Sequence, residues 1–491
     1  MKRTACLMLM LSVVLTSAAA CGGSSDEKPA GEIAQTSAAA ETPAEETPET
    51  TEARLEPDIP DTKYGGQKLR FLSRVVKDAV VRFYSEVASD EINGEIMNDT
   101  VYERTRRIEE KYEIEIVNDV SDSVSGTFKK TYLAGEDNWD VVIDGFTDSL
   151  GSANAGYTAD LTQIPYIDLS RPWWDTRVAD AMMIKGHVYS AIGAMNTWTD
   201  SHSYGVVFNK VLAGDFGIEP YGLVRDNKWT LDTFTALLDQ VTSDINGDGT
   251  LDENDRYGTM GENFNFRLHV LASDVFLISR DGDGNPVLNI NERLYQAADK
   301  VCRMMCGDSY VMAEQLKLDD VWTGMRNIFR AGNSLFYTGG IEQMLIFRDL
   351  ETDIGLLPFP KLDEQQENYA HSFSTYWSSA MVIPRNTSAA EFTGHMLEAI
   401  QADSYYSTSV AYHDVLLQGK AMRDADSVEM LQIIRRSRTI DPEFAYSFID
   451  IGSIYSNLIS NKSADGLMSA LEKKQSSAQK KIDKLISQIE G

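Results

Sequence analysis

The chain of 491 residues carries 75 acidic and 45 basic side chains, which gives a formal net charge of −30. This acidic balance argues against nucleic-acid binding, which needs basic patches, and against a strongly anionic ligand, so a neutral ligand fits best. The length predicts two or three domains, and the hydrophobic content of 43% is that of an ordinary globular protein.

The N-terminus has the pattern of a secretory signal peptide. Two basic residues precede a short apolar region over residues 5–16, and a run of small residues then ends at Cys21. A cysteine at the cleavage point resembles the lipobox of bacterial lipoproteins, with Ala18 in place of the usual bulky aliphatic residue. We therefore expect residues 1–20 to be removed and Cys21 to be lipidated; without the lipid, the product would be secreted.

Residues 21–62 are expected to form a lipidated, disordered acidic linker. The segment after Cys21 contains five prolines and no aromatic residue, so it cannot bury enough apolar area to offset its ordering entropy. Its typical reach is roughly 35 Å. The apolar part of the signal peptide is shorter than the about 20 residues that span a bilayer, so anchoring would rest on the lipid.

The first part of the folded region alternates strands and helices. Residues 69–73, 112–117 and 140–143 have the pattern of strands, and residues 91–111 have helical spacing between the first two strands. This order predicts a parallel sheet covered by helices. Because ligands of such sheets bind beyond the carboxyl ends of the strands, Asp144 is expected near a cleft.

A second group of elements follows. Thr230 is a plausible cap for a helix that contains Phe234 and Leu238. Short apolar strands are expected at residues 187–192, 204–209, 334–337, 354–358 and 380–383. From residue 388 onward the chain has mostly helical patterns, ending in an amphipathic helix over residues 467–489.

The segment from Asp244 to Asp255 matches the calcium loop of EF-hands. Carboxylate and amide side chains alternate, Gly249 stands at the sharp turn, and position 12 is Asp255 instead of the usual Glu. The ligands that this pattern predicts are the side chains of Asp244, Asn246, Asp248 and Asp252 and the carbonyl oxygen of Thr250. The alternative is an Asx-rich turn without an ion.

A second acidic segment, residues 281–285, is a weaker calcium candidate. Pro286 stands where the turn glycine should be, and the residues after it alternate as in a strand. A hairpin turn is therefore the better interpretation.

Two cysteines remain after the signal peptide and Cys21. Cys302 and Cys306 are four residues apart in a helical stretch, residues 291–305 and the position after it, so they share one helix face. We expect buried, reduced core residues. A strained redox pair or a metal site stays open as the alternative, although two sulfurs without a nearby histidine make a poor zinc site.

Seven segments in a fixed order carry a resemblance to a known family. They are NDTVYERTRRIEEKY (98–112), NWDVVIDGF (138–146), DLSRPWWD (168–175), VVFNK (206–210), KWTLDTF (228–234), GLLPFPK (355–361) and AMVIP (380–384). Together they resemble the extracellular solute-binding proteins of family 1, the maltose-binding-like proteins. The resemblance implies a two-lobed, type II periplasmic-binding-protein-like α/β fold, with each lobe a mixed sheet covered by helices. It implies that crossing strands join lobe one, residues 66–195 plus 336–383, to lobe two, residues 196–335 plus 384–491.

The same resemblance implies a function. Such a protein captures a carbohydrate, here expected to be an oligosaccharide, and delivers it to the permease of an ABC importer. It would act as a monomer, lipid-anchored on the extracellular face of the membrane, or in the periplasm if the source has an outer membrane. In calcium-carrying members the carboxylates after the turn complete a structural Ca²⁺ site, which favours Asp252 and Glu253 over Asp255.

The resemblance also selects candidate ligand-binding residues, because crossing segments line the cleft in this family. Aromatic rings cover the CH faces of sugars, and polar side chains bond their hydroxyls. The expected platforms are Trp198, Tyr337, Tyr376 and Trp377, and the expected hydroxyl partners are Asp144 and Asp200. The segment Trp173-Trp174-Asp175 is expected to be structural.

Catalysis is not expected. The sequence contains no GxSxG, HExxH, P-loop or CxxC motif, and its six histidines lack metal-ligand spacing. A two-carboxylate glycosidase stays open on composition, although no acidic pair is singled out. Two alternatives within the binding class are a receptor for a peptide and a receptor that serves a sensor kinase.

Overall fold

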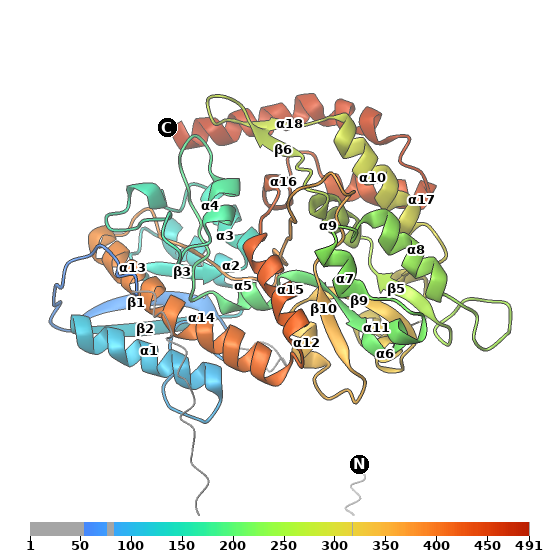
Figure 1. The fold of residues 1–491 in the computed structure, drawn as a ribbon. Helices are drawn as coiled ribbons and strands as arrows, with labels where there is room; N and C mark the ends of the chain where they lie inside the picture. Colours follow the sequence, from blue (N-terminus) through green and yellow to red (C-terminus); the bar gives the residue numbers. More distant parts are fainter. Residues whose placement is uncertain (1–53, 76–82, 317, 491) are drawn as a thin grey trace, which may run out of the picture. The chain divides into compact units, whose positions relative to one another are not determined.

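A computed structural model describes residues 54–75, 83–316 and 318–490 (Figure 1). The chain divides into a unit of Met1–Leu55 and a unit of Glu56–Gly491, and the fold is that of the second unit. The expected signal peptide, Cys21 and most of the expected linker lie outside the described residues. No helix within the described ranges is long and apolar enough to cross a membrane.

The end of the expected linker belongs to the folded unit. Residues 54–62 form no helix or strand, but Ile59 and Tyr64 pack against the core of the first sheet. The Tyr64 hydroxyl lies 2.6 Å from Nδ1 of His395. The folded unit therefore begins near Glu56, several residues before the expected boundary at residue 62.

The first sheet has four strands in the order β11-β3-β1-β2. Its strands are β1 (Gln67–Arg74), β2 (Ile114–Ser121), β3 (Val141–Asp144) and β11 (Ala380–Val382). The first three are parallel, and β11 runs antiparallel beside β3. The helices that follow these strands are α1 (Ile96–Tyr112), α2 (Val124–Leu133), α3 (Phe146–Asn154), α4 (Thr176–Met182) and, after β11, α13 (Ala390–Tyr406).

Both faces of the first sheet are buried. Phe71 and Ile143 point into a core shared with α1 and α13, whereas Leu72 and Val142 point into a core shared with α2. Alternating side chains therefore bury both faces of the sheet, as expected for parallel strands between helices.

The second sheet has five strands in the order β10-β4-β9-β5-β8. Its strands are β4 (Tyr204–Asn209), β5 (Tyr257–Gly261), β8 (Tyr310–Met312), β9 (Ser334–Gly340) and β10 (Ile354–Leu357). Only β4 runs against its neighbours. The helices between its strands are α6 (Lys210–Asp215), α7 (Pro220–Arg225), α8 (Leu231–Val241), α9 (Asn265–Ala272), α10 (Glu292–Met305), α11 (Val321–Arg330) and α12 (Glu342–Ile346).

The C-terminal helices lie over both layers. They are α14 (Thr408–Val410), a π-helix (Ala411–Gln418), α15 (Ala425–Arg436), α16 (Pro442–Tyr446), α17 (Ile451–Asn461) and α18 (Leu467–Glu490). In Figure 1, α18 starts beside α17 and runs across to the side of α3 and α4. Leu485 and Gln488 near its end line one hollow with Ala153 and Asn154 of α3. The last helix therefore bridges the two sheet layers.

The strand pairing differs from the expected lobe boundaries. The resemblance places residues 336–383 in lobe one, but β9 and β10 pair in the second sheet and only β11 returns to the first. The chain therefore crosses between Leu357 and Ala380. Helix α13, assigned to lobe two, packs through Met396 and Ile400 on the first sheet. Each reassigned segment is apolar, and sequence pattern alone does not show which sheet it covers.

The strand expected at residues 187–192 does not form. Ala191 makes a single bridge to Met381, and His187 turns back to Ile184 through Lys185, which has φ of 52°. Strand β11 is only three residues long and already pairs with β3 on its other side. It therefore has few backbone groups left to form a ladder with residues 187–192.

Two local expectations are confirmed. The Thr230 hydroxyl caps α8 by accepting the Thr233 N–H. The turn at residues 281–285 joins β6 (Ile278–Arg280) to β7 (Pro286–Leu288) as a hairpin, and Oδ1 of Asp281 accepts the N–H groups of Asp283 and Asn285.

Cys302 and Cys306 are free thiols with their sulfurs 3.9 Å apart. Cys302 is buried, and burial raises its pKa to about 12. Cys306, at the C-terminal end of α10, is half-buried. Since such a thiol ionises only far above neutral pH, Cys302 is a packing residue in this structure.

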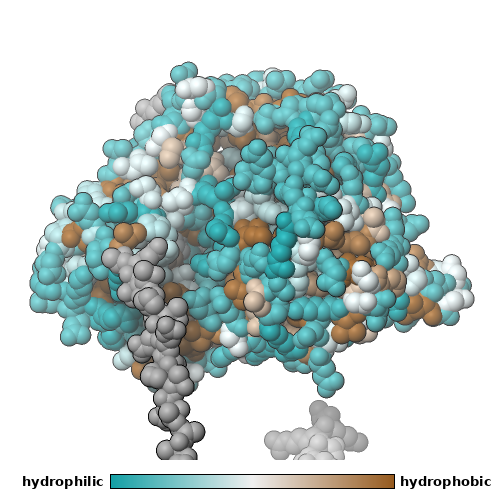
Figure 2. All heavy atoms as spheres, viewed as in Figure 1, coloured by the Kyte–Doolittle hydropathy of each residue, from teal (hydrophilic) through white to brown (hydrophobic). Residues whose placement is uncertain are grey.

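The face of the molecule in Figure 2 is mostly hydrophilic. Hydrophobic residues on it stand in small separate groups. Scattered apolar residues of this kind are usual on soluble proteins, so this face presents no broad apolar docking surface.

Arg438 ties three distant segments together. Its Nε donates to Asp175 at the start of α4 over 2.5 Å, and its Nη1 donates to Asp200. Asp200 belongs to α5 (Thr197–Ser201), the helix that leads into β4, and also accepts from His413 over 3.1 Å. Burial alone would raise the pKa of Asp200, but Arg438 and His413 hold it below its usual range.

Replacing Arg438 by Met should destabilise the fold strongly. Asp175 and Asp200 would lose their shared guanidinium while the Arg438 side chain is only 14% exposed. We expect the free energy of unfolding to fall by about 3–5 kcal/mol, the usual cost of breaking a buried ion pair on one side. Urea denaturation measures it, with exposed Arg436→Met as the matched control. A loss of less than about 1 kcal/mol would contradict this role.

Candidate functional site

A cavity of about 330 Å³ opens at one edge of the five-stranded sheet. The parallel strands β5 and β9 end there at Gly261 and Gly340, and the antiparallel β4 starts there at Tyr204, paired with Gly340. This edge holds the carboxyl ends of the parallel strands, where ligands of α/β sheets bind. We name the cavity the aromatic cleft.

Aromatic rings line the cleft in a row. Phe264 lies between Tyr204 and Trp322, with ring centroids 6.0 and 6.4 Å away. On the other side, Trp377 stacks with His202 at 6.4 Å and 24° between the planes. Trp322 and Trp377 are each 42% exposed, which leaves ring surface open to a ligand.

Buried oxygens without a partner also line the cleft. Within the described part of the chain, Oε2 of Glu262, Oε2 of Glu342 and Oγ1 of Thr338 find no hydrogen bond. Buried polar atoms are almost always satisfied, so these three oxygens are suited to donors that a ligand brings. Sugar hydroxyls are such donors.

The surroundings of the two glutamates favour the protonated, neutral form of their carboxyl groups. Burial and the neighbouring Glu314 raise the pKa of Glu262 to about 7, and burial raises the pKa of Glu342 to about 7. Oε1 of Glu342 accepts from Gln343 over 2.9 Å, and Gln343 in turn accepts from Nε of Arg326 over 3.2 Å. The carboxyl of Glu342 is therefore held in position before a ligand arrives.

Glycines at the strand ends make room for these groups. A Cβ at Gly340 would lie 1.9 Å from Oε2 of Glu342, and one at Gly261 would lie 2.2 Å from the Tyr310 hydroxyl. Only glycine lets the polar side chains fold back over the ends of β9 and β5.

Two of the expected platforms lie at the cleft. Trp377 lines it, and Tyr376 stands beside Trp377 with ring centroids 4.8 Å apart and is 62% exposed. Arg74 at the end of β1 holds this segment by donating to the Tyr376 carbonyl over 2.8 Å. The expected hydroxyl partner Asp144 anchors Arg74 by accepting from its Nε over 3.0 Å.

The other three expected residues lie elsewhere. Trp198 and Tyr337 are 3% and 1% exposed, and Tyr337 packs against Phe329 and Phe347 in the core. Asp200 is occupied by Arg438 and His413. The reason is that every residue of β9 and of α5 is buried, so these three side chains are occupied by packing and internal ion pairs.

Sequence reasoning missed Trp322, Glu262 and Glu342. Each glutamate follows a glycine that ends a parallel strand, by one residue in Gly261-Glu262 and by two in Gly340-Ile341-Glu342. The rule that selected Asp144 at the carboxyl end of β3 could have selected them too, had the strand ends been known.

The expected structural segment Trp173-Trp174-Asp175 supports the fold. Both indole N–H groups donate to Glu398 of α13, each over 2.8 Å. Asp175 caps α4 by accepting from Val178.

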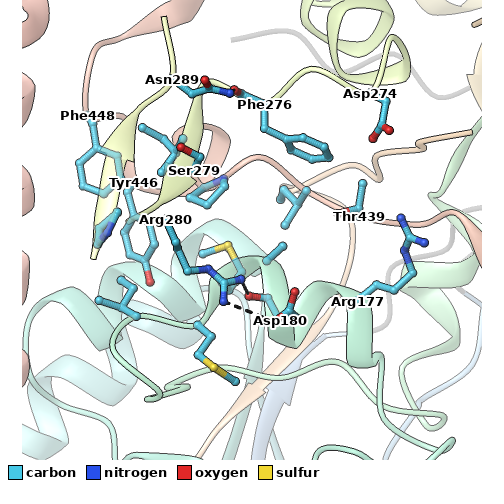
Figure 3. A pocket seen from close by; sticks show the side chains of 18 residues that line it. Arg177, Asp180, Asp274, Phe276, Ser279, Arg280, Asn289, Thr439, Tyr446 and Phe448 are labelled. Carbon is cyan, nitrogen blue, oxygen red and sulfur yellow. Dashed lines mark hydrogen bonds and ion pairs between the residues drawn. The ribbon is translucent and has the colours of Figure 1, made fainter. Parts of the chain in front are cut away.

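A larger cavity of about 520 Å³ lies between α4 and the β6–β7 hairpin. Figure 3 shows Arg280 pointing from the hairpin toward Asp180 of α4, joined by an ion pair of 3.3 Å. Tyr446 and Phe448 form part of its wall. None of its lining residues ends a parallel strand, and for that reason the aromatic cleft is the stronger candidate site.

The expected calcium loop is an exposed series of Asx turns. Asp244 accepts the N–H groups of Gly247 and Gly249 over 2.6 and 2.7 Å. The buried Asp255 accepts from the amides of Ile245 and Asp252 and closes the loop. Among residues 54–75, 83–316 and 318–490, no three acidic, His or Cys side chains converge closely enough to hold a metal.

No family model and no curated protein matches the sequence. Many solved structures resemble it, among them the following three. A cyclo/maltodextrin-binding protein complexed with maltotetraose is 12% identical with a TM-score of 0.54, covering 87% of this chain and 98% of that chain. RafE from Streptococcus pneumoniae is 15% identical with a TM-score of 0.53, covering 84% of this chain and 98% of that chain. UspC from M. tuberculosis is 12% identical with a TM-score of 0.53, covering 84% of this chain and 100% of that chain. At such identities the likeness establishes the fold, and the expected type II, maltose-binding-like fold is confirmed.

Replacing the titratable carboxyl of Glu342 by an amide should change how the stability of the fold depends on pH. The folded protein keeps a proton on Glu342 up to pH of about 7, because burial raises its pKa to about 7 from 4.5. The unfolded chain loses that proton near pH 4.5, so the contribution of Glu342 to stability falls as pH rises through this window. Glu342→Gln should therefore match the wild type at pH 4 and exceed it by about 1–3 kcal/mol at pH 8.

Urea denaturation at several pH values measures this difference. The matched control is Glu110→Gln on the exposed side of α1, which removes a charge of the same kind from the surface. A Glu342→Gln effect that is the same at pH 4 and pH 8 would show that Glu342 is not held neutral.

Proposed function

We propose that this chain is a membrane-tethered solute-binding protein that captures an oligosaccharide in the aromatic cleft and delivers it to an ABC importer. The observation that carries the proposal is the pairing of open rings with buried oxygens that find no hydrogen-bond partner among the described residues. Trp322 and Trp377 offer flat surfaces for the CH faces of sugars, and Glu262, Glu342 and Thr338 accept hydroxyl donors.

The chemistry of the cleft supports a neutral ligand. Glu262 and Glu342, whose pKa values are raised to about 7, carry little charge in a mildly acidic medium. Among the described residues that line the cleft, Arg326 is the only cation, and its Nε donates to Gln343. The bound maltotetraose of the similar cyclo/maltodextrin-binding protein is such a ligand.

Binding without catalysis fits the cleft better than glycoside hydrolysis. A glycosidase needs one ionised and one protonated carboxyl, so its environment pushes their pKa values apart. Here burial raises the pKa of both glutamates to about 7. Oε1 of Glu342 is also held by Gln343. We therefore infer a receptor, and a peptide receptor or a partner of a sensor kinase is the alternative within the same class.

The N-terminal pattern indicates where the protein acts. Lipidation at Cys21 and a linker with a reach of roughly 35 Å would hold the folded unit near the membrane. That reach keeps its effective concentration at a permease high, which favours delivery. We propose a monomer that closes around the connections between its two sheets when the sugar binds.

Substitutions at the two tryptophans test the proposal. We expect maltotetraose, or another oligosaccharide of a panel, to raise the melting temperature without release of reducing sugar. Trp322→Ala and Trp377→Ala should each weaken binding at least about tenfold, or about 1.4 kcal/mol, because a sugar would lose its platform.

Trp322→Phe and Trp377→Phe are the matched controls, since they keep a ring and should retain most of the affinity. Calorimetric titration of the purified protein gives the constants. If a sugar binds equally well to all four variants, the aromatic cleft is not its site.

We propose separately that the loop from Asp244 to Asp255 binds a structural Ca²⁺. Carboxylate and amide oxygens are the ligands that Ca²⁺ prefers, and the side chains of Asp244, Asn246, Asp248, Asp252 and Glu253 together with the Thr250 carbonyl supply them. These groups would have to draw together around the ion. Because Asp255 already accepts from two loop amides, Asp252 and Glu253 are favoured to complete the site.

Calcium should then stabilise the protein through this loop. Millimolar Ca²⁺ should raise the melting temperature by several degrees more than Mg²⁺ at equal ionic strength. Asp248→Asn keeps the turn-forming oxygen but removes a charge and should abolish most of that shift. Asp283→Asn, in the turn of the β6–β7 hairpin, is the matched control and should leave it intact. Equal responses of the wild type to Ca²⁺ and Mg²⁺ would contradict the proposal.

A further inference from the structure

A further cavity, of about 410 Å³, gathers positive charge in this acidic protein. It lies between the start of α4, the α5 region and the end of α15. Four arginines and two aspartates line it: Arg177, Arg435, Arg436, Arg438, Asp175 and Asp200. We name it the arginine pocket.

Both aspartates are already engaged. Asp175 accepts from Val178 at the start of α4 and from Nε of Arg438 over 2.5 Å. Asp200 accepts from Arg438 and from His413. Their charge is therefore directed at Arg438, and the other three arginines of the pocket make no ion pair with any described residue.

Arg435 is the arginine whose position needs an explanation. It is half-buried, and burial lowers its pKa, with nearby Asp200 acting in the opposite direction and Arg438 adding repulsion. Asp414 and Tyr405 also lie near enough to favour its charge, yet neither forms an ion pair with it. A guanidinium withdrawn from water beside another guanidinium is unfavourable unless an anion joins it.

The wall of the pocket is rigid. Trp173 and Trp174 line it and are fixed by their indole bonds to Glu398, each of 2.8 Å. Arg438 is locked by its two aspartates, and Nε of Arg436 donates to the Gln432 carbonyl over 3.1 Å. An anion entering the pocket would meet donors that are already in place, which lowers the cost of binding.

We propose that the arginine pocket binds a tetrahedral oxyanion, either free phosphate or the phosphate group of a small molecule. Guanidinium groups bind phosphate through paired N–H donors, and several arginines around one hollow favour a multiply charged anion. The volume exceeds that of phosphate itself and leaves room for a small phosphate ester. The site is distinct from the aromatic cleft, and the proposal does not rest on the proposed function.

Thermal shift with inorganic phosphate tests the site. In a chloride buffer of constant ionic strength, phosphate should raise the melting temperature of the full chain and saturate. Arg435→Gln should remove most of that rise, and its melting temperature in chloride should equal or exceed that of the wild type because an unfavourable charge is gone. Exposed Arg106→Gln on α1 is the matched control and should respond as the wild type does.

Calorimetric titration with phosphate, a phosphate monoester and a dicarboxylate separates the sources. Phosphate alone, or the monoester at higher affinity, supports the proposal; a preference for the dicarboxylate overturns it. If Arg435→Gln responds to phosphate as the wild type does, phosphate is an adventitious ion only and the proposal fails. Oligosaccharide binding should be unchanged in Arg435→Gln, so a failure here leaves the sugar site untouched.

Discussion

The structure depends on one constraint: its four-stranded and five-stranded sheets are both buried on both faces. In β4 the side chains of Val206 and Phe208 enter one core and Val207 enters another, and β1 divides Phe71 from Leu72 in the same way. Side chains in the middle of the strands are therefore committed to packing. Any group that meets a ligand must come from a strand end, a helix start or a connection between the sheets.

That constraint decides which polar groups form the candidate site. Glu262 and Glu342 come just after strand ends, and Trp377 comes from the connection that leads back to β11. Tyr337 has the right chemistry for a sugar platform but lies inside β9, so it packs against Phe329 and Phe347. Whether a residue lines the candidate site therefore depends less on its chemical type than on its distance from the end of a strand.

Much of the local structure could be predicted from the sequence. The strand over residues 204–209, the Thr230 cap and the hairpin after Asp281 all follow from patterns a few residues long. The lobe boundaries, the isolated bridge at Ala191 and the burial of Asp200 depend on partners far away in the chain. No local pattern specifies that Arg438 will lie between Asp175 and Asp200. Asp200 was therefore predicted to bind a ligand, whereas it binds Arg438.

The aromatic cleft and the arginine pocket differ in the charges of the residues that line them. The aromatic cleft holds two glutamates whose pKa values burial raises to about 7, which suits a neutral sugar. The arginine pocket is lined by four arginines and therefore suits an anion.

A crystal structure with the oligosaccharide that binds most tightly tests the central claim most directly. The account predicts sugar rings on Trp322 and Trp377 with hydroxyls at Glu262 and Glu342; a sugar seated instead in the cavity between α4 and the β6–β7 hairpin would contradict it.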